Sequence, residues 1–256
     1  MHLRSLVTAT AVALTVSVAP TMAAEAASKP TYKVSISTSK AKADVGQTIK
    51  VSGKVTGPKA AKKLLTVQVK AGSGTWKNVK KVRTTAKRGY ATNVKVSTAG
   101  KQSVRVVAPK SKKAKQGVSK ARGFVGWRWL DLTVQRKTTE GSVKIGAAKI
   151  AGTSYAKAIT IADGRIVFTI NDSCDTFKGA AGVKDGVDSD ATLTTFVSTP
   201  GWGDGTPHTL TANASAKNIR YGVKDGHWFG MIAEGSAVTV VNPTVHCSVN
   251  RLIAPQ

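Results

Sequence analysis

Hydrophobic and polar residues alternate along many short stretches of this chain, and a period of two predicts β-strands. In the first half, the alternating stretches cover residues 32–37, 48–55, 65–69, 76–82, 92–96 and 103–107. Turn signals such as Gly57-Pro58 and Arg88-Gly89 separate these stretches. The spacing is typical of a β-sandwich of about seven strands.

The second half continues with the same kind of pattern. Its strand-like stretches cover residues 142–150, 165–170, 177–183, 191–197, 208–212, 219–223 and 238–248. No helical pattern of about ten residues or more lies between them, which argues against a parallel α/β fold. We therefore expect an all-β protein made of two sandwiches.

The N-terminus has a different pattern, that of a secretory signal peptide. Met1–Arg4 is positively charged, and Leu6–Ala19 is an uncharged run too short to span a bilayer comfortably. Small residues follow, and we place cleavage after Ala26, so that residues 1–26 are removed. No later stretch is long and apolar enough for a transmembrane segment. We expect a secreted, extracellular protein, with the cell wall as one destination.

Charge divides the chain into two domains. Residues 28–125 hold 25 Lys and Arg against one acid, Asp44, whereas residues 126–256 hold 13 against 11 acids. We therefore expect a basic domain at residues 28–123 and a second domain at residues 126–256.

The surplus of Lys and Arg admits three interpretations. A field of this size concentrates polyanions, which outside a bacterial cell are wall phosphates and the anionic head groups of lipids. The charge could instead serve solubility alone. Nucleic acid would bind only non-specifically, because no aromatic residues are interleaved with the basic runs to stack on bases.

Both cysteines, Cys174 and Cys247, lie in the second half. Disulfides persist in exported proteins, so we expect the two residues to be paired. They stand 73 residues apart and form no Cys-x-x-Cys, so a metal site at this pair is not expected. Closing a loop of that length stabilises a domain by roughly 4 kcal/mol on the chain-entropy model.

Four segments of the first half together resemble bacterial extracellular Ig-like domains, over about residues 31–123. They are VGQTIKVSGKV, LTVQVKAGSGTWKNV, TTAKRGYATNVKV and AGKQSVRVVA. The resemblance implies an Ig-like sandwich. It also makes Trp76 the hairpin tryptophan of that family, either a packing residue or a ligand platform.

The second half resembles the NPCBM-type carbohydrate-binding module of actinobacterial secreted proteins, over about residues 126–250. The matching segments are GWRWLDL, KIAGTSYAKAI, GRIVFTINDSCDTFKGAAGVKD, ATLTTFVS and VNPTVHC. The resemblance implies a jelly-roll, galactose-binding-like sandwich in which Cys174 pairs with Cys247 on the last strand. It also makes Tyr155, in the Gly-x-x-Tyr segment, a candidate ligand contact.

A sugar site needs an exposed aromatic ring with polar groups beside it. Two Gly-containing segments between the expected strands offer this combination. Their candidate ligand contacts are Trp202, Asp204, Asp225, His227 and Trp228. The alternative is that both tryptophan rings pack over the core, which is also the expected role of Trp127 and Trp129.

Three acids, Asp185, Asp188 and Asp190, approach the density of oxygen ligands that calcium prefers. The cluster lacks the Glu that completes an EF-hand loop, so a solvated turn is the alternative. No other cofactor is expected.

Catalytic motifs such as Gly-x-Ser-x-Gly, the P-loop and His-Glu-x-x-His are absent from the sequence. Asp204, Asp225 and Glu234 could supply a pair of glycosidase carboxylates, but any acid-rich loop region permits this. We therefore expect a secreted, non-catalytic protein that binds carbohydrate or cell-wall polymer, with the basic domain attracting anionic envelope material. The alternative is a structural or adhesive envelope protein without a sugar site, held by charge.

Overall fold

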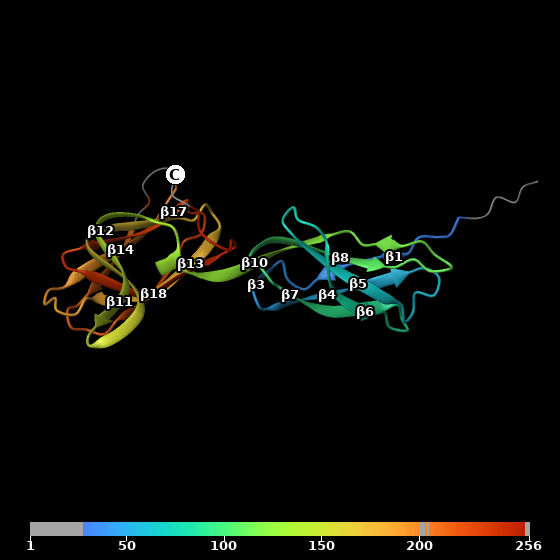
Figure 1. Cartoon of the computed structure of the whole chain (residues 1–256), viewed down its shortest axis with the longest axis horizontal. Helices are drawn as coiled ribbons and strands as arrows, with labels where there is room; N and C mark the ends of the chain where they lie inside the picture. Colours follow the sequence, from blue (N-terminus) through green and yellow to red (C-terminus); the bar gives the residue numbers. More distant parts are fainter. Residues whose placement is uncertain (1–27, 200–202, 204, 254–256) are drawn as a thin grey trace, which may run out of the picture.

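The structure is a computed structural model that describes residues 28–199, 203 and 205–253. The expected signal peptide, residues 1–26, lies outside these residues. Within them, the only helical segment is the 3-10 turn η1 (Leu132–Val134), and all other regular elements are strands. Two β-structured bodies lie end to end (Figure 1). The prediction of an all-β sandwich fold is confirmed.

The N-terminal half packs two sheets face to face. Its strands are β1 (Lys33–Val34), β2 (Ser37–Thr38), β3 (Lys42–Asp44), β4 (Thr48–Thr56), β5 (Leu64–Ala71), β6 (Lys77–Arg83), β7 (Gly89–Lys95), β8 (Gly100–Ala108) and β9 (Gly117–Val118). One sheet joins β1, β2 and β7 to β4, and the other contains β6, β5 and β8. Alternate residues of β4 and β5, such as Ile49, Val51 and Val67, are fully buried between the sheets, while Lys50 and Lys54 face outward.

The C-terminal half has its own buried core. Its strands are β11 (Thr138–Ile150), β12 (Thr153–Thr169), β13 (Cys174–Val183), β14 (Ala191–Ser198), β15 (Gly205–Leu210), β16 (Lys217–Gly222), β17 (Trp228–Glu234) and β18 (Val238–Cys247). The long strand β12 pairs with β18 near Ile159 and with β17 from Gly164 onward. It changes partners next to Asp163, which has a positive φ of 58°. The rings of Phe177 and Phe229 meet at 4.8 Å in the enclosed core.

A single strand, β10 (Arg122–Asp131), belongs to both halves. Its first residues pair with β8 and β3, and Arg128–Asp131 pairs with β18, so one hydrogen-bonded sheet continues from one half into the other. Gly126 lies where the partners change. A Cβ there would lie 2.1 Å from the carbonyl oxygen of Thr98, so a side chain would push the two backbones apart. The segment that joins the two halves is thus a strand.

The predicted disulfide is confirmed. Cys174 at the start of β13 and Cys247 at the end of β18 are bonded, with their Cα atoms 4.0 Å apart. Both residues are buried in the C-terminal core. The bond joins two neighbouring strands of the same sheet and leaves no free cysteine.

Side chains from both halves also meet at the junction. The His246 Nε2 atom lies 3.0 Å from Asp44 Oδ1, and its Nδ1 atom lies 2.9 Å from Asp175 Oδ1. The rings of Trp127 and Trp129 lie 5.1 and 4.8 Å from the His246 ring, centroid to centroid. Asp44 is the sole acid of residues 28–125, so the one carboxylate of the basic half bonds to the other half.

Candidate functional site

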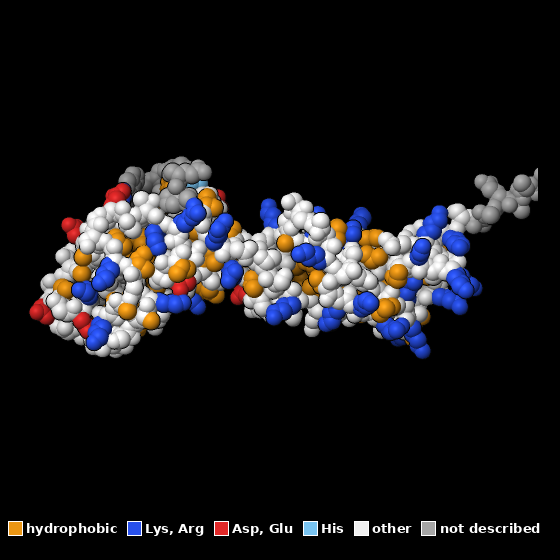
Figure 2. Space-filling view, viewed as in Figure 1, with side chains coloured by type: hydrophobic (Ala, Val, Ile, Leu, Met, Phe, Trp, Pro, Cys, Tyr) orange, Lys and Arg blue, Asp and Glu red, His pale blue; other side chains and the backbone are white. Residues whose placement is uncertain are grey.

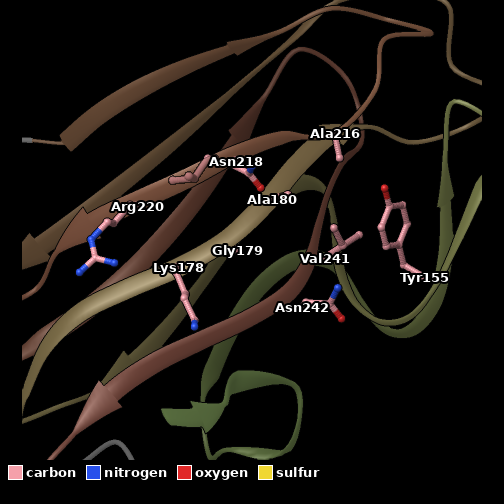
Figure 3. A pocket seen from close by; sticks show the side chains of 10 residues that line it. Tyr155, Lys178, Gly179, Ala180, Ala216, Asn218, Arg220, Val241 and Asn242 are labelled. Carbon is pink, nitrogen blue, oxygen red and sulfur yellow. The ribbon is translucent and has the colours of Figure 1, made fainter.

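A groove of about 540 Å³ crosses the outer face of β13, β16 and β18. Five polar side chains line it: Tyr155, Lys178, Asn218, Arg220 and Asn242. Lys178 and Arg220 lie side by side at one end of the groove, and Tyr155 lies toward the other end (Figure 3). Tyr155 is the one predicted ligand contact that the structure places here.

Strand pairing explains why the groove is both polar and hollow. Lys178 lies directly opposite Arg220 in the β13–β16 pair, and Ala180 lies opposite Asn218. Side chains alternate along a strand, so these residues share the outer face, while Phe177 and Ile219 point into the core. The small side chain of Ala180 leaves room above the sheet for a ligand.

A β-bulge brings Asn242 to this face. Lys178 pairs with Thr244 and Ala180 pairs with Val241, so Asn242 and Pro243 together oppose Gly179. Asn242 has a positive φ of 47° and is exposed. Bulges re-aim side chains and occur often beside functional sites.

Tyr155 stands on the far wall of the groove. Its ring packs against a small cluster built on Ile150, Ala158 and Val241, which is separate from the main core. Within the described chain, its hydroxyl makes no hydrogen bond, and neither do the side chains of Asn218 and Asn242. These three groups are therefore free to bind a ligand.

Lys178 and Arg220 are both exposed, and neither forms an ion pair with a described carboxylate. Lys178 Nζ lies 4.0 Å from the centroid of the Trp129 ring, a cation–π contact that orients the side chain. The Trp129 ring also contacts the His246 ring, so the groove adjoins the junction between the two halves.

The other predicted ligand contacts do not lie in this groove. Trp202 and Asp204 fall outside the described residues. Asp225 is in an exposed turn and forms an ion pair with Lys224 at 3.4 Å. His227 and Trp228 make an edge-to-face contact at 4.6 Å between ring centroids.

Trp228 was expected in a loop, and this placement is wrong. It is the first residue of β17, which lies between β12 and β14 in the sheet, and it is half-buried. The sequence pattern hides this strand because Gly230 interrupts it. The Phe196 ring occupies the space above Gly230, since a Cβ there would lie 2.2 Å from a ring atom.

Two of the three acids proposed for calcium accept hydrogen bonds from backbone amides. Asp185 Oδ2 accepts a hydrogen bond from the Gly152 amide at 3.0 Å, and Asp190 Oδ1 accepts one from the Ala212 amide at 2.9 Å. Among the described residues, no group of three or more His, Cys, Asp or Glu side chains is placed to hold a metal ion. Calcium binding by Asp185, Asp188 and Asp190 stays a prediction.

The surface of the N-terminal half is dominated by cations. On the face drawn in Figure 2, Lys and Arg side chains are spread along this half, while acidic side chains gather on the other. All seven residues of β6 are exposed or half-buried, and they include Lys77, Lys80 and Lys81. Trp76 is half-buried with the Arg105 guanidinium stacked 4.2 Å from its ring centroid, which favours the packing interpretation.

Comparison with known proteins gives no assignment. No family model and no curated protein matches the chain. One solved structure that aligns is described as "Putative membrane anchored protein" from Corynebacterium diphtheriae. It is 10% identical, with a TM-score of 0.29, over 84% of this chain and 50% of that chain, so it supports no argument about fold or function. In the described part of the present chain, no helix is both long and apolar enough to span a membrane.

Proposed function

We propose that this is a secreted, non-catalytic binding protein that recognises carbohydrate or cell-wall polymer through the groove on β13, β16 and β18. The basic N-terminal half would attract anionic envelope material and hold it near that groove. We also propose that residues 126–250 are related to NPCBM-type modules and residues 31–123 to bacterial Ig-like domains, on the segments quoted above.

The observation that carries the proposal is the set of unpaired polar groups in the groove. A sugar offers hydroxyls along its rim and an apolar C–H face, which suit amides and an aromatic ring. Asn218, Asn242 and Tyr155 supply these groups on one open surface. They stand on paired strands, so the site is largely formed before a ligand arrives.

The charge of residues 28–125 supports the second part of the proposal. Its 25 Lys and Arg face a single acid, and that acid is bonded to His246. The basic surface therefore has no acidic side chain of its own half to neutralise it. Such a surface attracts polyanions through long-range forces that salt weakens.

A catalytic role finds no support in the groove. Tyr155 and Lys178 are the only lining residues whose side chains commonly act as acid, base or nucleophile, and no carboxylate or His lines the groove beside them to activate either one. Secretion is supported by the buried disulfide together with the N-terminal sequence pattern. A structural or adhesive envelope protein held by charge alone is the second candidate, and the exposed lysines of β6 favour it.

A glycan array probed at low salt and again at about 1 M salt separates these two functions, because the Debye length falls to about 3 Å at the higher salt. Retention of particular glycans at high salt, lost in Tyr155→Ala, supports recognition in the groove. Binding to every polyanion alike, with complete loss at high salt, would leave the adhesive role.

A further inference from the structure

We infer that the groove takes a saccharide that bears a phosphate or a carboxylate, with the anionic group held between Lys178 and Arg220. This inference rests on the proposed function, because it names the class of ligand for the same groove. Two observations support it. Lys178 and Arg220 lie opposite each other on neighbouring strands, and further polar side chains line the groove beside them.

The anion end is defined by Lys178 and Arg220. Residues directly opposite in an antiparallel pair have their Cβ atoms about 5 Å apart, and like charges in that position destabilise the sheet. The C-terminal half has 11 acids for its 13 Lys and Arg, yet no described carboxylate pairs with either residue. A phosphate or carboxylate between them would relieve the repulsion and accept charge-assisted hydrogen bonds from both.

In the structure the Lys178 side chain reaches across β18 toward β10, on the side of β13 away from Arg220. Its ammonium group lies over the ring of Trp129, a residue of β10 whose ring also contacts the His246 ring. An anion beside Arg220 would draw the Lys178 ammonium off this ring, a movement that the flexible four-carbon stem of the side chain permits. Arg220 adds the planar fork of donors that suits a bidentate contact.

The saccharide end follows directly along the groove. Asn218 lies two residues before Arg220 on β16 and therefore on the same face. The bulge turns Asn242 toward the same opening, and the Tyr155 ring stands beyond it. An inorganic anion would use only the two cations, whereas an anionic saccharide would also meet the amides and the aromatic ring.

The inference is tested by ¹⁵N-NMR titration of the full mature, disulfide-bonded chain with four probes: a hexose 6-phosphate, the corresponding hexuronate, the neutral hexose and inorganic phosphate. We expect the phosphate ester or the uronate to shift the amide signals of Lys178, Asn218, Arg220 and Asn242. Arg220→Gln should weaken that binding by about tenfold, because a charge-assisted contact is lost. The matched control is Lys144→Gln, an exposed lysine on β11 outside the groove, which should leave it unchanged.

Two results overturn the inference while leaving the proposed function in place. One is binding of the neutral hexose in the groove with the same affinity as the charged sugars. The other is binding of the charged sugars there with an affinity that Arg220→Gln does not change. Inorganic phosphate binding as tightly as the phosphate ester also overturns it, because the saccharide would then add nothing. Failure of all four probes to shift the groove signals contradicts both the inference and the proposed function.

Discussion

The two halves of the chain hold their positive charge in different ways. In the N-terminal half, cations are spread over exposed strands such as β6, and the single acid is engaged at the junction. In the C-terminal half, charges nearly balance, yet two cations stand opposite each other without a carboxylate beside a groove. A dispersed field attracts any polyanion, whereas positioned groups select among ligands.

The two halves also differ in how they are stabilised. The N-terminal half relies on the core between its two sheets, built on residues such as Leu65 and Val104. The C-terminal half has a larger core and the disulfide. The shared strand β10 and the Asp44–His246–Asp175 contacts tie them together.

The largest expected effect separates the halves by stability. Replacing both Cys174 and Cys247 with Ala should cost the C-terminal half roughly 4 kcal/mol, because the unfolded chain is no longer closed into a long loop. Thermal unfolding followed by the five tryptophans and by NMR should show a lower transition for this half, with a smaller change in the N-terminal half. An equal loss in both halves would show that they unfold as one unit.

The second prediction concerns the junction. Asp44→Ala leaves a nitrogen of the His246 ring without its partner, which should cost about 1–3 kcal/mol. It should also broaden the distribution of angles between the halves, as small-angle scattering would record. Asp188→Ala, at an exposed acid of the other half with an ordinary backbone conformation, is the matched control and should change neither quantity. Unchanged scattering from the Asp44 variant would assign the rigidity to β10 alone.

Strand periodicity predicts much of this architecture, because strands such as β4 alternate strictly between buried and exposed residues. It misses β17, because Gly230 interrupts the hydrophobic pattern of that strand. The Phe196 ring occupies the space that a side chain at Gly230 would need. It also predicts only the end of β12, a strand of 17 residues whose first five residues are exposed or half-buried.

The groove was beyond sequence reasoning for a different reason. Lys178 and Arg220 become neighbours only through the β13–β16 register, and Asn242 reaches them only through a bulge. Asp44 and His246 stand 202 residues apart in sequence. Tyr155 was found because it lies in a recognisable segment, but its partners depend on pairing that no local pattern specifies.

The third prediction alters the dispersed charge. Replacing Lys77, Lys80 and Lys81 of β6 with Gln should weaken binding to anionic wall polymer at low salt and flatten its salt dependence, because fewer counterions are released. Arg220→Gln removes one charge and should leave the salt dependence nearly unchanged. Binding measured by co-sedimentation across a salt series checks both. If binding falls with salt equally steeply for the β6 variant and the unaltered chain, the N-terminal half does not attract the polymer by its charge.

The smallest effect concerns pH. Burial, and then the charge of Lys217, lower the pKa of His208, whose Nε2 lies 3.1 Å from Thr195 Oγ1. The unfolded chain therefore binds a proton at higher pH than the folded chain, so stability falls as pH drops through about 6.5. His208→Gln should lose less stability over that range than the unaltered chain, as judged by melting temperature. Residues 28–125 contain no His, so the difference should be confined to the C-terminal half.

The central claim is that dispersed charge attracts the ligand and the groove recognises it. The most direct test is binding of wall polymer to the full mature chain at about 1 M salt, where long-range attraction is screened. The account predicts residual binding that Arg220→Gln weakens by about tenfold, that Tyr155→Ala abolishes and that the triple β6 variant leaves intact. Complete loss of binding at high salt, or residual binding that the groove variants do not change, would contradict it.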